Sequence, residues 1–120
     1  MPRVLLIDDD PDLRESLALG LEEHGISVDV APDGADALAH LGASDARPDA
    51  ILLDLGMPRM NGWQFRDLQK RHPALSQIPV LVLTGEKPLG IDAQGVLQKP
   101  FTIDRLVDAI RRLTRGAGAR

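Results

Sequence analysis

Three short runs of continuous apolar residues constrain the fold of this chain more than any other feature of its sequence. The runs are Val4–Ile7, Ala50–Leu53 and Val80–Leu83, each as long as a strand and free of polar residues. Such runs are typical of strands that are buried on both faces of a parallel sheet. A fourth segment, Ile26–Val30, alternates apolar and polar residues, which indicates a half-exposed strand at a sheet edge. A weaker fifth run is Val96–Leu97.

Segments with the period of an amphipathic helix separate these runs. Their apolar positions are Leu13, Leu17 and Leu21; Ala35, Leu38 and Ala39; Phe65 and Leu68; and Ile103, Leu106, Val107, Ile110 and Leu113. Strands that alternate with helices form right-handed crossovers and a doubly wound parallel sheet with helices on both faces. The sequence therefore predicts an α/β, flavodoxin-like fold with five parallel strands in the order 2-1-3-4-5.

The fourth crossover is unusually short. Residues 85–98 must supply both this connection and the fifth strand, whereas a crossover that includes a helix needs roughly 10–12 residues of its own. The connection also contains Gly85, Pro88 and Gly90, which oppose a long helix. We therefore expect a shortened or irregular fourth helix.

Length and composition favour a single soluble domain. A chain of 120 residues fits one compact domain, which we expect over residues 1–115, with a flexible tail at 116–120. The absence of cysteine excludes a disulfide scaffold, a cysteine-based zinc site and a thiol nucleophile. The N-terminus lacks a signal-peptide pattern, and no apolar run approaches the roughly 20 residues of a membrane helix. We expect a cytoplasmic protein that does not bind membranes.

Charge is distributed unevenly along the chain. Residues 1–60 carry 13 of the 18 acidic residues but four of the 14 basic ones, so the second half is basic. The acidic half is a poor surface for nucleic acid and a plausible one for a divalent cation. Most of the arginines in the basic half belong to the last helix and the tail, where solvated charge is the simpler interpretation, so we expect no direct contact with nucleic acid.

Polar side chains follow the central apolar runs at the points where the strands are expected to end. They are Asp8, Asp9 and Asp10 after the first run, Asp54 after the third, Thr84 after the fourth and Lys99 after the fifth. Each has an ordinary explanation alone, because Asp and Thr often cap helices and a lone Lys is usually solvated. Ligands of open parallel sheets bind beyond the carboxyl ends of the strands, so the whole set is expected to converge on one site.

The chemistry of such a cluster follows from its charges. Two carboxylates about 4 Å apart repel by about 4 kcal/mol at an effective dielectric constant of about 20. A set of oxygen ligands without His or Cys suits a hard cation, and Mg²⁺ fits best. A cation and an ammonium group that face a carboxylate nucleophile are what phosphoryl transfer needs. The segment 85–90 lacks the spacing of a P-loop, so we expect a phosphoryl donor other than a bound nucleotide.

At this point the sequence strongly resembles the receiver domains of two-component response regulators, of the single-domain, chemotaxis-regulator type. The matching motifs are Val4-Leu5-Leu6-Ile7-Asp8-Asp9-Asp10-Pro11, Ile51-Leu52-Leu53-Asp54-Leu55-Gly56-Met57-Pro58-Arg59-Met60-Asn61-Gly62, Val80-Leu81-Val82-Leu83-Thr84 and Lys99-Pro100-Phe101. They cover nearly the whole chain, in the order that the family shows.

The resemblance implies that Asp54 accepts a phosphoryl group from a histidine kinase or a histidine phosphotransfer protein. It also implies a Mg²⁺ site in which Asp9 and Asp54 bind the ion directly, Asp8 binds mainly through water, and Gly56 supplies a backbone carbonyl. The partner downstream is an unidentified protein.

The resemblance implies two further residues of the reaction. Thr84 would bind a phosphoryl oxygen and move on activation, and Lys99 would pair with the phosphoryl group. The Lys99–Pro100 peptide bond would be cis, and Asp10 is expected to cap a helix.

The sequence departs from the family pattern at the short fourth crossover and at Val96, where the family often has an aromatic residue. We therefore expect retained phosphorylation chemistry and an altered output face on the fourth helix and fifth strand.

Three functional hypotheses follow. The leading one is a stand-alone phosphoacceptor module, not an enzyme beyond its own phosphorylation and dephosphorylation. A receiver excised from a longer regulator stays open as a variant of this hypothesis. The second is a pseudo-receiver, an interaction module that phosphate does not regulate. The third is a Mg²⁺-dependent phosphatase with an aspartyl nucleophile, which would need Asp8 and Asp10 as its aspartate pair.

Overall fold

The computed structural model describes residues 2–43, 47–54, 62–71, 75–85 and 93–118. Within these ranges the elements are β1 (Arg3–Ile7), α1 (Pro11–Glu23), β2 (Ser27–Ala31), α2 (Gly34–Ala43), β3 (Ala50–Asp54), α3 (Gly62–Arg71), β4 (Val80–Thr84), β5 (Gly95–Gln98) and α4 (Ile103–Gly118).

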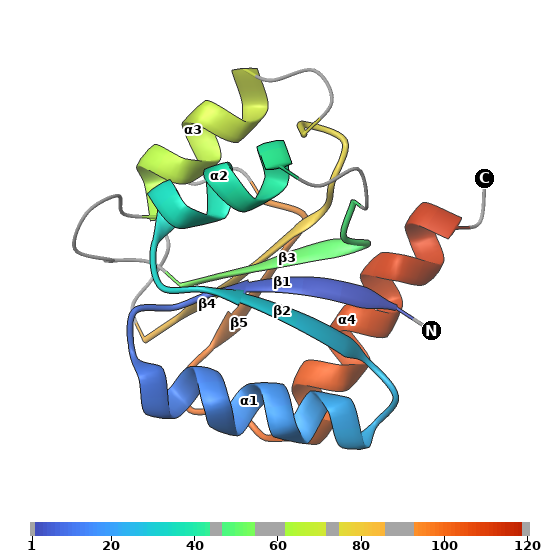
Figure 1. The fold of residues 1–120 in the computed structure, drawn as a ribbon. Coiled ribbons are helices and arrows are strands. Elements are labelled where there is room, and N and C mark those ends of the chain that lie inside the picture. Colours follow the sequence, from blue (N-terminus) through green and yellow to red (C-terminus); the bar gives the residue numbers. More distant parts are fainter. Residues whose placement is uncertain (1, 44–46, 55–61, 72–74, 86–92, 119–120) are drawn as a thin grey trace.

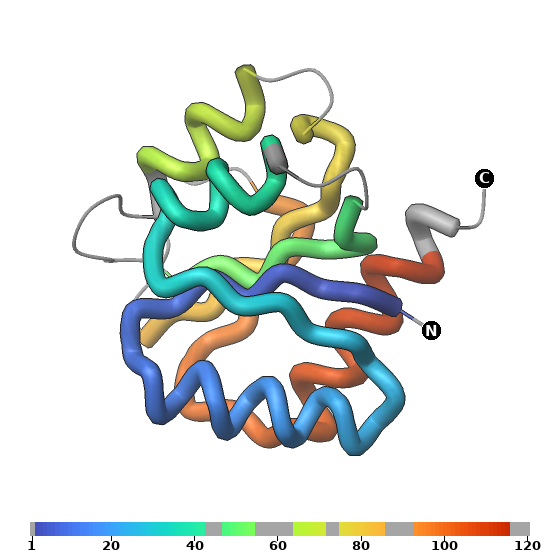
Figure 2. The backbone as a smooth tube through the Cα atoms, in the orientation of Figure 1, coloured from blue at the N-terminus to red at the C-terminus, as the bar shows by residue number. Residues whose placement is uncertain are grey.

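The strands form one sheet in which every pair is parallel, in the order β2-β1-β3-β4-β5. The predicted fold class and strand order are therefore confirmed. Helices α1 and α4 lie side by side on one face of the sheet, and α2 and α3 cover the other (Figures 1 and 2). No helix within the described ranges combines the length and the apolar character needed to cross a bilayer.

Each central strand contributes to two separate cores because both faces of the sheet are covered. In β1, Val4 and Leu6 pack on the side of α1 and α4, whereas Leu5 and Ile7 pack on the side of α2 and α3. All five residues of β3 and of β4 are buried. This burial on both faces explains why the sequences of the central strands are continuous apolar runs. The site residues are attached to the ends of these well-packed strands.

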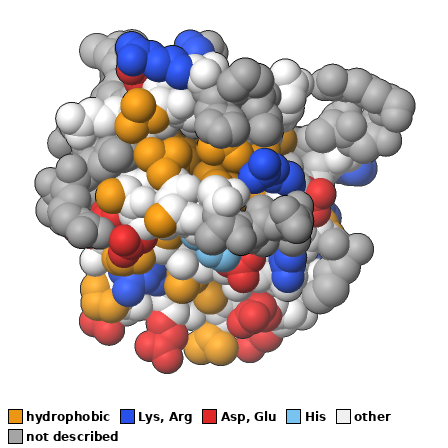
Figure 3. Space-filling model, turned by 45° about the horizontal axis from the view of Figure 1, so that its top comes forward, with side chains coloured by type: hydrophobic (Ala, Val, Ile, Leu, Met, Phe, Trp, Pro, Cys, Tyr) orange, Lys and Arg blue, Asp and Glu red, His pale blue; other side chains and the backbone are white. Residues whose placement is uncertain are grey.

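The two edge strands are half-exposed, as expected for strands that lack a neighbour on one side. Val30 in β2 is 48% exposed, and so is Val96 in β5. The alternation in the sequence of the second strand therefore identified an edge correctly. Acidic side chains gather along the lower edge of the molecule in the view of Figure 3, and Asp12, Glu15, Glu22 and Glu23 of α1 are all exposed.

The connection from β4 to β5 comprises residues 85–94, of which 86–92 lie outside the described residues. The short or irregular fourth helix expected in this connection, which is not the element labelled α4, falls on residues 86–92 and so lies outside the described residues. At the other end of the chain, α4 continues to Gly118 and so runs three residues into the expected flexible tail.

The predicted apolar face of α3 is wrong in one position. Phe65 is buried as expected, but Leu68 is 41% exposed and Gln69 is fully buried in its place. The Gln69 amide nitrogen donates hydrogen bonds to the carbonyls of Leu75 and Ile78, and its oxygen accepts one from Arg66 Nη1. Burial of this glutamine is tolerated because its amide nitrogen finds acceptors in the segment before β4, where the Leu75 carbonyl also accepts a hydrogen bond from the Ile78 backbone nitrogen.

Candidate functional site

The predicted site residues stand at one edge of the sheet. Asp8 follows the last residue of β1, Asp54 and Thr84 end β3 and β4, and Lys99 follows the last residue of β5. Because all strands are parallel, these four positions belong to the same edge. The structure thus brings together side chains that are up to 91 positions apart in the sequence, from Asp8 to Lys99.

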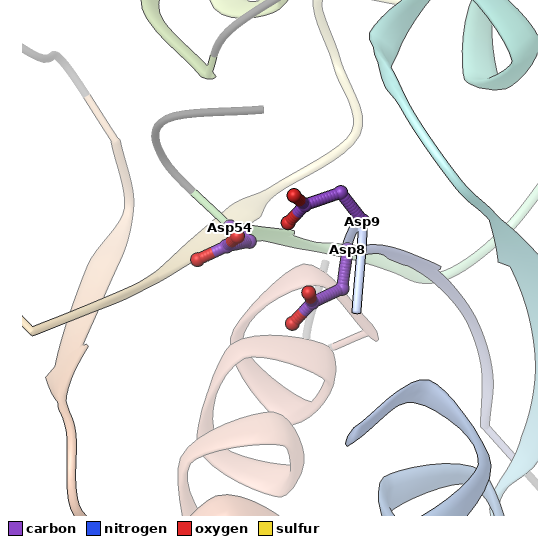
Figure 4. Close-up of side chains that lie close together, drawn as sticks. All are labelled: Asp8, Asp9 and Asp54. Atoms are coloured by element: carbon purple, nitrogen blue, oxygen red, sulfur yellow. The ribbon is translucent and has the colours of Figure 1, made fainter. Parts of the chain in front are cut away.

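Three carboxylates gather where β1 and β3 end (Figure 4). Each of Asp8, Asp9 and Asp54 offers an oxygen, and these atoms all lie within 4.8 Å of one another. Asp8 and Asp54 are 1% and 7% exposed, whereas Asp9 is exposed to solvent. The site therefore has a buried floor of two carboxylates and one carboxylate at its solvent side.

Lys99 supplies the positive charge that faces this cluster. Its Nζ donates a hydrogen bond to Asp54 Oδ1 at 3.1 Å and lies 4.0 Å from Asp8 Oδ2. Its backbone nitrogen donates to the carbonyl of Thr84 at 2.7 Å. This hydrogen bond connects the segment that follows β5 to the end of β4. The peptide bond between Lys99 and Pro100 is cis, as predicted.

The Asp8–Asp10 turn is organised by its own side chains. The Asp10 backbone nitrogen donates to Asp8 Oδ1 at 3.0 Å. Asp10 Oδ1 accepts hydrogen bonds from the backbone nitrogens of Asp12 and Leu13, so it caps the N-terminus of α1. The expected capping role of Asp10 is confirmed, and this explains why its carboxylate is not among the three that converge.

One contact at this turn was missed by the sequence analysis. Arg14 of α1 reaches back and donates a hydrogen bond from Nη1 to the backbone carbonyl of Asp8 at 2.8 Å. The sequence signal available was an arginine one helical turn after the acidic cluster, which by itself predicts only a solvated charge.

Asp8 Oδ2 has no hydrogen-bond partner. Among the described residues, it is the one buried side-chain nitrogen or oxygen that lacks such a partner. Leaving a buried carboxylate oxygen without a donor is costly, because the lost hydration is not replaced. A cation bound to this oxygen would compensate for the lost hydration. Three carboxylates without a nitrogen or sulfur ligand are the donor set of a hard ion such as Mg²⁺, so the residues present fit that ion.

Burial shapes the titration of both inner carboxylates. It raises the pKa of Asp54 to about 6, with a further rise from the charge of Asp8 and an opposing effect of the hydrogen bond from Lys99. Burial also raises the pKa of Asp8, against the lowering effects of the Asp10 backbone hydrogen bond and of Lys99. A positive charge close to either carboxylate stabilises its ionised form and so opposes the effect of burial on its pKa.

Two of the predicted site residues are less fully described by the structure. Thr84 is 4% exposed at the end of β4, between the strands that carry Asp54 and Lys99. Gly56, expected to supply a backbone carbonyl to the metal, lies outside the described residues.

Comparison with known families gives a match that covers most of the chain. Residues 4–111 match the model of the response regulator receiver domain. Among individual proteins, the chain is 42% identical to the response regulator MprA of Mycolicibacterium vanbaalenii and 41% identical to that of Mycobacterium avium, in each case over 94% of its own length. It spans about half the length of these curated relatives, 50% and 51%.

Solved structures of receiver domains and response regulators have the same fold as this chain. The signal receiver domain of a signal transduction histidine kinase from Syntrophus aciditrophicus superposes with a TM-score of 0.88 at 31% identity, covering 97% of this chain and 92% of that one. The chemotaxis response regulator CheY4 of Vibrio cholerae superposes with a TM-score of 0.83 at 32% identity, covering 94% and 98%.

Proposed function

Because the chain belongs to the response regulator receiver domain family, we propose that it accepts a phosphoryl group on Asp54. The observation that carries this proposal is the hydrogen bond from Lys99 Nζ to Asp54 Oδ1 beside two further carboxylates. A histidine kinase or a histidine phosphotransfer protein is the proposed donor. The cytoplasm is the proposed location, on the grounds of family membership alone.

In the proposed reaction, a carboxylate oxygen of Asp54 attacks the phosphorus of a phosphohistidine. The bond from phosphorus to the histidine nitrogen breaks, its electron pair stays on that nitrogen, and an acyl phosphate forms on Asp54. The negative charge on the transferring group then lies close to the ammonium of Lys99. That lysine is already directed at Asp54 Oδ1, so it needs little rearrangement to pair with the phosphoryl oxygens.

Asp8, Asp9 and Asp54 are the residues that would hold Mg²⁺, with the backbone carbonyl of Gly56 as a further proposed ligand. When bound, this ion supplies positive charge that offsets the repulsion between the carboxylates and the incoming phosphoryl group. The hydroxyl of Thr84 is the proposed hydrogen-bond donor to a phosphoryl oxygen. Its place at the end of β4 lies between the strands that carry the nucleophile and the lysine.

The proposed readout is a change in the binding of another protein, and the chain is not proposed to turn over external substrates. The phosphatase alternative is disfavoured by the state of Asp10. That mechanism would need Asp8 and Asp10 as a pair, but Asp10 Oδ1 is engaged by two backbone nitrogens of α1.

Intact-protein mass spectrometry after incubation with acetyl phosphate tests the proposal, with and without Mg²⁺. We expect the wild-type chain to gain one phosphoryl group in a Mg²⁺-dependent manner, and Asp54→Asn to gain none. Asp108→Asn removes an exposed carboxylate of α4 that pairs with Arg112 and is not among the site residues, so it should gain the phosphoryl group as the wild type does. A wild-type chain that binds Mg²⁺ but gains no phosphoryl group would favour the pseudo-receiver.

A further inference from the structure

We infer that Arg14 is a positioning residue for the metal-binding turn, which it holds through the peptide unit between Asp8 and Asp9. The inference rests on the proposed function, because it assigns a role to Arg14 in the binding of Mg²⁺ by these carboxylates. It starts from a contact that neither capping nor core packing of α1 requires.

The contact joins α1 to the backbone of the acidic turn. Arg14 Nη1 donates to the carbonyl oxygen of Asp8 at 2.8 Å, and that carbonyl belongs to the peptide unit whose nitrogen is that of Asp9. Near the same turn, the Asp10 backbone nitrogen donates to Asp8 Oδ1. The peptide unit before Asp9 is thus held by the guanidinium, and the one after it by the Asp8 carboxylate.

Asp9 depends on this backbone more than its neighbours do. Asp8 accepts the hydrogen bond from Asp10, and Asp54 accepts one from Lys99. Asp9 is exposed, and no side-chain hydrogen bond or ion pair of Asp9 is found within the described residues. The direction of its carboxylate is therefore set by the turn that carries it, and a group that fixes the turn fixes the third metal ligand.

The surroundings of Arg14 leave room for a direct test. The side chain is half-buried and borders a shallow hollow that it lines with Pro11, Glu15, Ala18 and Val30. Because this hollow is open to solvent, we expect a free guanidinium ion to enter the space that a shortened Arg14 side chain leaves and to donate to the carbonyl of Asp8. The chain also offers a matched control at the other end of α1, where Arg111 Nη2 donates to the carbonyl of His24 at 3.1 Å. Arg14 donates to a carbonyl two residues before the N-cap of α1, and Arg111 donates to the carbonyl of its C-cap residue, so only the first contact lies at the proposed metal site.

The test measures the affinity for Mg²⁺ by isothermal titration calorimetry, without any phosphoryl donor. Loss of a group that orients a metal ligand typically weakens binding by 10-fold or more, so we expect Arg14→Met to raise the Kd for Mg²⁺ by about tenfold. Arg111→Met removes the same charge and the same kind of contact, and its Kd should equal that of the wild type. Equal Kd values for both variants would overturn the inference. A wild-type chain that binds no Mg²⁺ would overturn the proposed function as well, so the two failures are distinguishable.

A second measurement separates positioning from a general effect on folding. Titration of Arg14→Ala in guanidinium chloride, against sodium chloride of the same ionic strength, should recover part of the lost Mg²⁺ affinity, and Arg14→Lys should retain part of it. Urea unfolding of Arg14→Met and Arg111→Met should give similar midpoints, and backbone amide exchange at Asp9 and Asp10 should be faster only in the Arg14 variant. A loss of Mg²⁺ affinity that is not rescued and that follows the loss of stability would contradict a positioning role.

Discussion

The ammonium nitrogen of Lys99 lies 3.1 Å from Oδ1 of Asp54, although the two residues are 45 positions apart in the sequence. They come from strands that are not neighbours, because β4 lies between β3 and β5. The lysine therefore reaches across the end of β4, where Thr84 is buried. This arrangement brings a carboxylate, a hydroxyl and an ammonium group from three adjacent strands to one edge of the sheet.

Removal of Lys99 should slow phosphorylation without abolishing metal binding. In Lys99→Met, the transferring phosphoryl group loses the ammonium group proposed to pair with its oxygens, and the loss of one such donor typically costs about a hundredfold in rate. The pKa of Asp54 should also rise above its wild-type value of about 6, because Lys99 opposes the effect of burial. The rate of phosphoryl gain from acetyl phosphate, followed by mass spectrometry, checks the first effect. Lys70→Met, at an exposed position of α3, should leave that rate unchanged, and an equal rate for both variants would contradict the role of Lys99.

Without metal, the stability of the chain should fall as the pH rises toward neutrality. The pKa of Asp54 is raised from 3.8 to about 6 in the folded state, so the folded chain binds more protons than the unfolded chain between these values. The contribution to the free energy of unfolding is therefore lost as the pH rises from about 4 to about 6, and it amounts to at most about 3 kcal/mol.

Chemical unfolding at a series of pH values, in the presence of a chelator, measures this effect. Asp54→Asn carries no titrating group at this position, so its stability should decline less than that of the wild type and should exceed it at pH values above 6. The exposed Asp108→Asn serves as the control. Loss of its ion pair with Arg112 should lower the curve by at most about 0.5 kcal/mol and leave its shape unchanged. Parallel curves for the wild type and Asp54→Asn would show that Asp54 titrates with an ordinary pKa.

Mg²⁺ should stabilise the wild-type chain and should fail to stabilise Asp9→Asn. A ligand that binds the folded state alone adds about 2.7 kcal/mol to the free energy of unfolding at one hundred times its Kd. Asp10→Asn is the matched control, because Asn caps a helix as well as Asp does and the charge change is the same one residue away. Thermal unfolding with increasing Mg²⁺ should shift the midpoint for the wild type and Asp10→Asn. A shift of the same size in Asp9→Asn would remove Asp9 from the metal site.

Gln69 should be essential to the stability of α3. Its amide holds the carbonyls of Leu75 and Ile78 and accepts from Arg66. In Gln69→Met the Ile78 carbonyl and Arg66 lose the hydrogen bonds to this side chain, while the Leu75 carbonyl keeps the one from the Ile78 backbone nitrogen. The free energy of unfolding should therefore fall by about 1–3 kcal/mol. Gln64→Met, on the exposed side of the same helix, should change it by less than about 0.5 kcal/mol. Urea unfolding checks the difference, and similar values for the two variants would show that water replaces the lost hydrogen bonds.

The fold and the gathering of the candidate site residues were predictable from the sequence because both depend on simple repeating features. Continuous apolar runs mark strands buried on both faces, and Asp54 and Thr84 are found at the ends of two such runs. Once the strands are parallel, the ends of the runs must share an edge. No finer knowledge of side-chain geometry is needed for that inference.

Gln69 and Arg14 could not be predicted in the same way. Each side chain donates to carbonyls whose positions depend on another segment, the stretch before β4 for Gln69 and the β1–α1 turn for Arg14. A helical period cannot report such partners, and it favoured the exposed Leu68 over the buried Gln69 because leucine is the more apolar residue. Such contacts are long-range and polar, so the hydrophobic pattern of the sequence does not record them.

Identification of the phosphorylated residue tests the central claim most directly. The chain is incubated with acetyl phosphate and Mg²⁺, treated with sodium borohydride, which reduces an aspartyl phosphate to homoserine, and digested for peptide mass spectrometry. We predict homoserine at position 54 and at no other position, and none when Mg²⁺ is omitted. Homoserine at Asp8 or Asp9, or its absence from a wild-type chain that has gained a phosphoryl group, would contradict the assignment of Asp54 as the phosphoryl acceptor.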